Sequence, residues 1–171
     1  PKRSPVAASC EDVRVRICTL GDLLMDVVVR PDGVARPGDD IRARIAVGVG
    51  GQAANVAAWA AHLGAKARLV AARGDDAVGD LMHAELTERA VEVRGPVIAG
   101  PTGTVVAMLD AEGERSMMSD RGVSPEFLPE ALDSSWFGGV DRLHITGYSL
   151  IAEPFAYTAM AAAHQARAAG A

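Results

Sequence analysis

Two adjacent glycines followed by an asparagine form the segment best suited to holding a polar ligand. Gly50 and Gly51 precede an alanine-rich run, and Asn55 follows four residues after Gly51. Glycine lets a backbone approach a ligand closely, and a helix N-terminus offers N–H groups without partners. Asn55 adds both donors and an acceptor. These groups suit neutral hydroxyls or anions. The alternative is a glycine turn in which Asn55 bonds to the local backbone.

Two carboxylates, Asp22 and Asp26, follow the first predicted strand, over residues 14–20. Ligands of open α/β folds bind at the carboxyl ends of strands, so we expect both side chains there. Asp26 stands between Met25 and Val27, an apolar setting in which a carboxylate needs a partner. An ionised carboxylate can accept hydrogen bonds from two adjacent sugar hydroxyls. The alternative is a solvated or helix-capping aspartate.

Arg115 and Arg121 bracket the second strand of a predicted hairpin. Arg121 precedes Gly122 at the end of that strand, from which it could point into a cleft beneath the hairpin. The alternative for either arginine is a surface position or a pair with Asp120.

The glycine segment also satisfies the dinucleotide fingerprint G-x-G-x-x-A through Gly48, Gly50 and Ala53. That fingerprint should follow a buried parallel strand, whereas residues 41–47 alternate apolar and polar side chains. A dinucleotide site is therefore the weaker interpretation. The sequence contains no nucleophile elbow and no P-loop, and its four histidines have no metal-ligand spacing.

Strands and helices are expected to alternate through the first and last thirds of the chain. Gly64 stops the first helix, and Asp75 or Asp76 can cap the second. This alternation predicts an α/β fold with a mainly parallel sheet between helices. The first predicted strand, 14–20, continues as an extended segment over residues 23–29. The other predicted strands are 41–47, 66–72, 91–98, 104–110, 115–119 and 140–146, and the predicted helices are 53–63, 78–90 and 155–169.

The pieces at about 34–49 and 102–119 do not suit a buried parallel sheet, and they predict a small β lid. Residues 1–13 are expected to form a flexible tail, and residues 14–171 a single partial domain.

The 171-residue chain has a net charge of −5 and is 49% hydrophobic, values typical of a globular domain. The acidic balance argues against nucleic acid as a partner. No apolar run is long enough to span a membrane. Cys10 and Cys18 form neither a disulfide framework nor a metal pattern, which favours a reducing cytoplasm.

Taken together, several segments resemble the ribokinase-like carbohydrate kinases of the PfkB family, from about residue 14 to the end. The matching stretches are Gly21-Asp22 with Asp26, Gly50–Asn55, Gly64, Gly74–Gly79, Thr102–Thr104, Gly113–Ser116 and Asp120–Gly122. The resemblance implies an αβα sandwich with a β lid. It also implies transfer of the γ-phosphoryl of ATP, with Mg²⁺, to a hydroxymethyl group of a sugar or nucleoside.

By the same resemblance, Asp26, Gly50, Gly51 and Asn55 would hold substrate hydroxyls, and Asp22 is kept as a candidate beside them. Arg121 matches an arginine that some sugar-acid kinases of the family use for their substrate. Leu24 and Gln52-Ala53 depart from the pattern of ribokinases proper, so ribose is not favoured as the substrate.

The family's catalytic aspartate, anion hole and nucleotide pocket belong to its C-terminal half, and no matching motif occurs here. The last predicted helix stops at Gly170, one residue before the end. We therefore expect the N-terminal, substrate-binding portion of a cytoplasmic sugar kinase, inactive alone, with no catalytic or metal-binding residue of its own. A homodimer through the lid is a further expectation. The alternatives are a non-catalytic sugar-binding or regulatory fragment and, less favoured, a dinucleotide-binding oxidoreductase.

Overall fold

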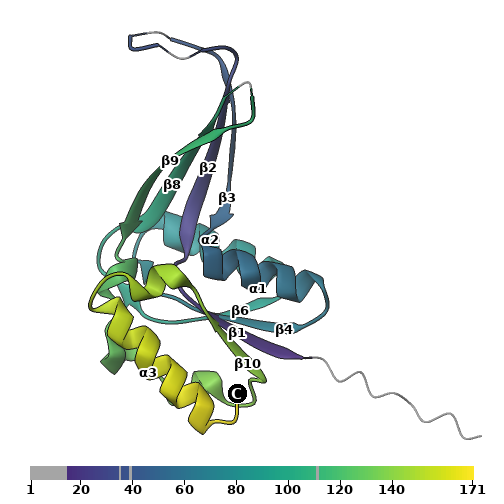
Figure 1. The fold of residues 1–171 in the computed structure, drawn as a ribbon, viewed down its shortest axis with the longest axis vertical. Coiled ribbons are helices and arrows are strands. Elements are labelled where there is room, and N and C mark those ends of the chain that lie inside the picture. The colour runs from purple at the N-terminus through teal and green to yellow at the C-terminus, as the bar shows by residue number, and fades with distance from the viewer. Residues whose placement is uncertain (1–14, 35, 39, 111) are drawn as a thin grey trace, which may run out of the picture.

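The computed structural model of the chain describes residues 15–34, 36–38, 40–110 and 112–171, so the predicted tail over residues 1–13 lies outside the described residues. Two four-stranded sheets dominate the described part. One forms the body of the molecule, and the other rises from it as a lid (Figure 1). Helices cover both faces of the body sheet, which confirms the predicted α/β class.

The body sheet is entirely parallel and has the strand order β10-β1-β4-β6. Its central strand β1 pairs on both sides, and its last three residues are buried, as expected for a strand covered on both faces. The strands are β1 (Arg16–Leu20), β4 (Lys66–Val70), β6 (Val91–Arg94) and β10 (Arg142–Ile145).

Three helices complete the body. Helices α1 (Gln52–His62) and α2 (Ala77–Glu88) pack with one face of the sheet, and α3 (Phe155–Ala168) packs against the other. Buried alanines of α1 allow close contact with the sheet. The short 3₁₀ helices are η1 (Ser124–Glu126), η2 (Pro129–Ala131), η3 (Ser134–Phe137) and η4 (Gly147–Leu150). None of the helices in the described part of the chain combines the length and apolar character needed to cross a membrane.

The ends of α1 and α2 follow the local signals in the sequence. Gly64 has φ +94° and closes α1: its N–H bonds to the carbonyl of Ala61, and the N–H of Ala65 bonds to that of Ala60. This is the Schellman pattern. Asp76 caps α2 by accepting a hydrogen bond from Gly79 N–H at 2.8 Å.

The lid sheet has the order β3-β2-β8-β9, with β2 and β8 parallel and the outer pairs antiparallel. Its strands are β2 (Leu24–Pro31), β3 (Ala43–Gly50), β8 (Thr102–Leu109) and β9 (Arg115–Gly122). Strand β2 is an addition to the lid pieces predicted at 34–49 and 102–119. Strand β3 also continues to Gly50, beyond the break predicted at Gly48.

The strand predicted over residues 91–98 is divided, and its two parts belong to different sheets. Strand β6 ends at Arg94, and β7 (Val97–Ile98) pairs instead with β5 (Arg73–Gly74). The chain turns at Gly95, which has φ +135° and lies against the backbone of Ala71. The positive φ and this close approach both require glycine.

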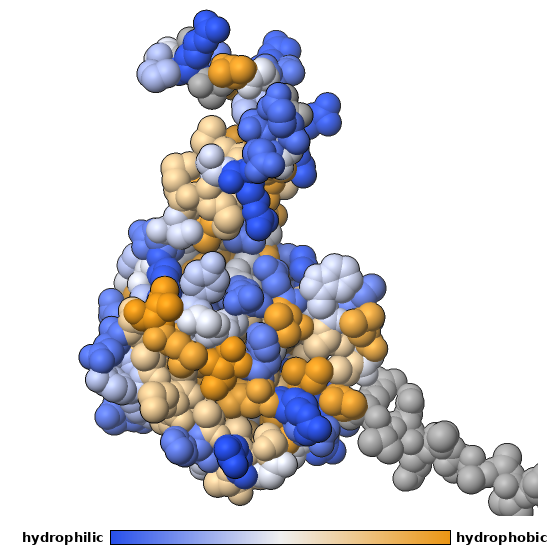
Figure 2. All heavy atoms as spheres, viewed as in Figure 1, coloured by the Kyte–Doolittle hydropathy of each residue, from blue (hydrophilic) through white to orange (hydrophobic). Residues whose placement is uncertain are grey.

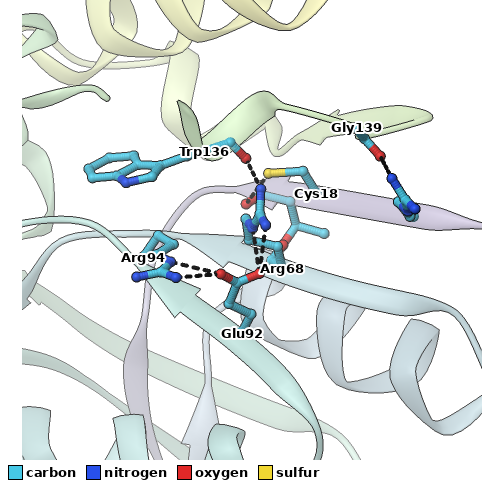
Figure 3. A network of polar contacts seen from close by, with 8 residues as sticks. Cys18, Arg68, Glu92, Arg94, Trp136 and Gly139 are labelled. Carbon is cyan, nitrogen blue, oxygen red and sulfur yellow. Dashed lines mark hydrogen bonds and ion pairs between the residues drawn. The ribbon is translucent and has the colours of Figure 1, made fainter. Parts of the chain in front are cut away.

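A network of charges covers the body sheet at its β6 edge (Figure 3). Glu92 of β6 forms ion pairs with Arg68 of β4 and with Arg94, each at 2.7 Å, and Arg68 also donates to the carbonyl of Trp136. Burial opposes the charge of Glu92, but hydrogen bonds from both arginines outweigh it and hold its pKa below the ordinary value. Charged side chains protect a sheet edge from further pairing.

Cys18 lies beside this network and is fully buried. Burial raises the pKa of its thiol to about 12. The side chain is therefore a neutral core residue.

Candidate functional site

A cavity of about 840 Å³ lies between the lid, helix α1 and the segment after β10. Its volume falls in the range of small-molecule sites. Five of the six predicted site residues line it, and the sixth, Gly50, lies directly beside it. The lining comprises Ile17, Asp22, Leu24, Asp26, Gly51, Gln52, Asn55, Val56, Trp59, Ala60, Leu63, Val105, Arg115, Met117, Ser119, Arg121, Tyr148 and Ile151.

Asp26 reaches the cavity from the lid sheet. It follows β1 in the chain and shares the cavity with Asp22, as expected, but it belongs to a strand of the lid, because the chain turns after β1 and starts β2 at Leu24. Asp26 is the third residue of β2 and lies opposite Gly48 of β3 and Val105 of β8. Its carboxylate belongs to the underside of the lid.

The Asp26 carboxylate occupies the space in which a side chain at Gly50 would lie. A Cβ added at Gly50 would come within 2.1 Å of Asp26 Cγ and Oδ1. Burial raises the pKa of Asp26 above its ordinary value. Among the described residues, no group donates a hydrogen bond to this carboxylate, and it forms no ion pair. Its acceptor capacity is therefore available to a ligand.

Gly51 and Asn55 form the floor of the cavity. Gly51 has φ +91° and precedes the first residue of α1; a Cβ there would lie 2.2 Å from the carbonyl oxygen of Asp22. No side chain caps this helix N-terminus. The backbone N–H of Asn55 donates to the Gly51 carbonyl, whereas its side chain is exposed and forms no hydrogen bond within the described part. The local-backbone alternative for the Asn55 side chain is therefore not what the structure shows.

Asp22 and Arg121 form a two-pronged ion pair that joins the body to the lid. Arg121 Nη2 donates to Asp22 Oδ1 at 2.8 Å, and Nε donates to Oδ2 at 3.1 Å. The hydroxyl of Ser124 also donates to Oδ1, at 2.6 Å. Both side chains are largely buried, with 8% and 20% exposed. Arg121 lies over the ring of Phe155 as well, 5.9 Å from its centroid.

A second acidic residue fixes the lid at β8. The carboxylate of Asp76, besides capping α2, accepts hydrogen bonds from the backbone N–H and the hydroxyl of Thr102, at 2.9 and 2.6 Å. Burial opposes its charge, but these bonds and that from Gly79 outweigh it and lower the pKa of Asp76. The root of the lid is thus tied to the body on both sides of the β8–β9 hairpin.

Sequence reasoning did not include the β9 residues Ser119 and Met117, which also line the cavity. A signal for them was available. Alternate residues of a strand share a face, so a cavity-facing Arg121 implies that Ser119, Met117 and Arg115 face the same way.

The structure gives less support to a dinucleotide site or a metal site. Strand β3, which precedes the glycine segment, is an antiparallel edge strand of the lid, so the dinucleotide fingerprint lacks the buried parallel strand that it requires. In the described ranges, no three His, Cys, Asp or Glu side chains are grouped so as to hold a metal ion.

Comparison with known proteins agrees with this architecture. A family model described as "pfkB family carbohydrate kinase" matches residues 15–171. An "ATP-dependent ribose-1-phosphate kinase" of Halopiger xanaduensis is 33% identical over 77% of this chain and 46% of its own length. A "Fructokinase" of Klebsiella pneumoniae is 32% identical over 91% of this chain and 48% of its own length.

The crystal structure of a fructokinase from Xylella fastidiosa superimposes with a TM-score of 0.76 at 27% identity, over 91% of this chain and 48% of that one. The chain thus spans about half the length of the curated relatives that it matches. The family match covers all of the described body and lid. The chain belongs to the pfkB family of carbohydrate kinases.

Proposed function

We propose that this chain is the substrate-binding N-terminal portion of an ATP-dependent kinase that phosphorylates a hydroxymethyl group of a sugar. The observation that carries the proposal is the single cavity that contains Asp26, Gly51 and Asn55, with Gly50 directly behind Asp26. Relatives named fructokinase and ribokinase support a sugar as the substrate class.

The groups around this cavity are complementary to a polyol. Asp26 can accept hydrogen bonds from two neighbouring hydroxyls, and the Asn55 amide can both donate and accept. Gly51 allows the backbone to approach the sugar. Two of the five N–H donors of Arg121 bond to Asp22, so the other donors can bond to a ligand. Asp22 lies at the edge of the site and holds Arg121 there. The lid above would exclude water from the transfer.

ATP would supply the phosphoryl group, with Mg²⁺ to neutralise its charge, and both would bind residues outside this chain. We therefore expect the chain by itself to bind a sugar without turning it over. Exposed apolar side chains support the need for a covering segment: Trp59 is 64% exposed and Ile151 70%, and both line the same cavity as Asp26. Apolar residues gather on the body below the lid in Figure 2.

A homodimer through the lid is a further part of the proposal. The face of the lid opposite the cavity exposes Ile45, Val47 and Met118, at 64%, 56% and 54%. A second copy could cover this apolar face. A Val47→Lys variant should then shift the protein from dimer to monomer in light scattering, and a wild-type monomer would contradict the idea. A cytoplasmic location also remains a prediction.

The test of the proposed function is ADP release by the full-length protein with a panel of sugars, sugar acids and nucleosides. Asp26→Asn should raise KM for the best substrate about tenfold or more, because a charged acceptor is lost. Glu88→Gln, an equivalent change at an exposed position on α2, should leave KM unchanged. Binding without turnover in the full-length protein would instead favour a non-catalytic sugar-binding role, and an unchanged KM for Asp26→Asn would remove Asp26 from the site.

A further inference from the structure

The cavity face of β9 carries a charged residue at its outer end. Alternate residues of this strand line the cavity, from Arg121 at the root through Ser119 and Met117 to Arg115. Ser119 lies level with Asp26, because both pair with Val105 of β8. Arg115 is four residues from Ser119, which is about 13 Å along an extended strand.

The two cavity arginines differ in their partners. Arg121 is engaged by the carboxylate of Asp22. Arg115 has no acidic group within ion-pair distance among the described residues. Its nearest acidic neighbour along the chain, Glu114, belongs to the hairpin turn, where its N–H donates to Asp110. Arg115 is therefore the cavity cation whose charge remains available.

Further cations lie on the same face of the lid. Arg30 of β2 pairs directly with Arg44 of β3. Since Arg30 is four residues beyond Asp26, it shares the side of the sheet that Asp26 occupies. Arg115 of β9, level with Leu109 of β8, completes a row of three arginines across the outer part of this face. Hydrophilic residues gather toward the tip of the lid in Figure 2.

Between this row and Asp26, the side chains on the cavity face are apolar. Val28, Ala107 and Met117 occupy the intervening row. The cavity thus presents a hydroxyl-binding carboxylate near the root of the lid and a free guanidinium farther out, separated by a band without competing charge. Arg115 and Asp26 line the same cavity, so one sugar that carries an anionic substituent can contact both.

We propose that Arg115 recognises an anionic group on the sugar, a phosphate monoester or a carboxylate, while Asp26 and Asn55 hold its hydroxyls. This inference rests on the proposed function and narrows its substrate class from sugars in general to anionic sugars. Arginine suits either group, because its planar guanidinium can form two parallel hydrogen bonds to an oxyanion. The opposite charges of Arg115 and Asp26 would also fix the orientation of the bound sugar, with its anionic group at Arg115 and its hydroxyls at Asp26.

The test compares matched neutral and anionic ligands with the full-length protein. Binding by calorimetry and turnover by ADP release are measured for fructose against fructose 1-phosphate, and for glucose against gluconate. We expect the anionic member of one pair to be preferred at least tenfold, and the pair that shows it identifies phosphate or carboxylate. Arg115→Ala should abolish that preference, whereas Arg115→Lys should retain part of it. Arg167→Ala, which removes an exposed arginine from the end of α3, should change nothing.

Two results would overturn this inference alone. One is a wild-type protein that takes each neutral sugar at least as well as its anionic counterpart. The other is an Arg115→Ala variant that weakens neutral and anionic ligands equally, which would indicate a purely structural role. Turnover of neutral sugars alone would leave the proposed kinase function intact, whereas no binding of any sugar would overturn both proposals.

Discussion

Replacing Gly50 with alanine should displace the Asp26 carboxylate, which we propose binds the substrate, without unfolding the protein. The new Cβ would lie 2.1 Å from Asp26 Cγ, whereas ordinary contact begins at 3.4 Å, so the carboxyl group has to move by about 1.3 Å. A displacement of about 1 Å in a positioned group can cost ~10²-fold. We expect Gly50→Ala to raise KM and Kd for the sugar by about 10- to 100-fold.

The stability of the Gly50→Ala variant should change little. The atoms in the way belong to the end of the Asp26 side chain, and an off-rotamer side chain costs only ~0.5–1.5 kcal/mol. Gly50 is not among the glycines with positive φ, so alanine is compatible with its backbone. Alanine also recovers ~0.4–1 kcal/mol by restricting the unfolded chain. The melting temperature should therefore stay near that of the wild type.

The assay is calorimetric binding together with steady-state kinetics of the full-length protein, arranged as a double-mutant cycle. Gly50→Ala should have no further effect once Asp26→Ala has removed the carboxylate. Gly48→Ala is the matched control, because its nearest neighbour, Glu85 Oε1, would lie 3.7 Å away. A Gly50→Ala variant with wild-type affinity would refute the reasoning. So would an equal loss of affinity in both backgrounds.

Three further predictions concern stability. Burial raises the folded-state pKa of Asp26, so ionisation of this group destabilises the fold as the pH rises above the ordinary pKa of 3.8. Asp26→Asn removes that cost. It should therefore raise the free energy of unfolding, measured in urea, at pH 7 but not at pH 3. The lowered pKa of Asp76 has the opposite sign: its contribution is present at neutral pH and is lost as pH falls below 3.8. Asp76→Ala should cost about 1–3 kcal/mol at pH 7, through loss of the cap and of the bonds from Thr102, and an equal loss at pH 2 would contradict this. Asp22→Ala and Arg121→Ala should each lower the free energy of unfolding by about 3–5 kcal/mol in the same assay, because each single change leaves a buried charge unpaired. The double variant should lose little more than either single variant. Additive losses would contradict the pairing.

Local signals in the sequence predicted many elements of the body. The glycine stop at Gly64 and the cap at Asp76 each depend on residues within one or two turns of the chain. Such signals act through backbone conformation and nearby hydrogen bonds, so they can be identified without the rest of the fold.

The extent of the lid was harder to predict. The sequence pattern predicted an extended continuation of the first strand over residues 23–29. Leu24–Pro31 instead forms β2, an inner strand of the lid sheet that pairs with β3 and β8. Strand pairing depends on segments distant in sequence, and the turn at Gly21-Asp22 does not specify which sheet the next strand enters.

The sequence by itself determined the family, the α/β class and the residue types available for binding, because these depend on motifs and on local periodicity. The tertiary structure alone decided which of them meet. It placed the Asp26 carboxylate where a Gly50 side chain would be, and it paired Asp22 with Arg121 across 99 residues of chain. It also left Arg115 in the cavity without an acidic partner among the described residues. Contacts of this kind follow from sheet order and register, which no spacing along the chain specifies.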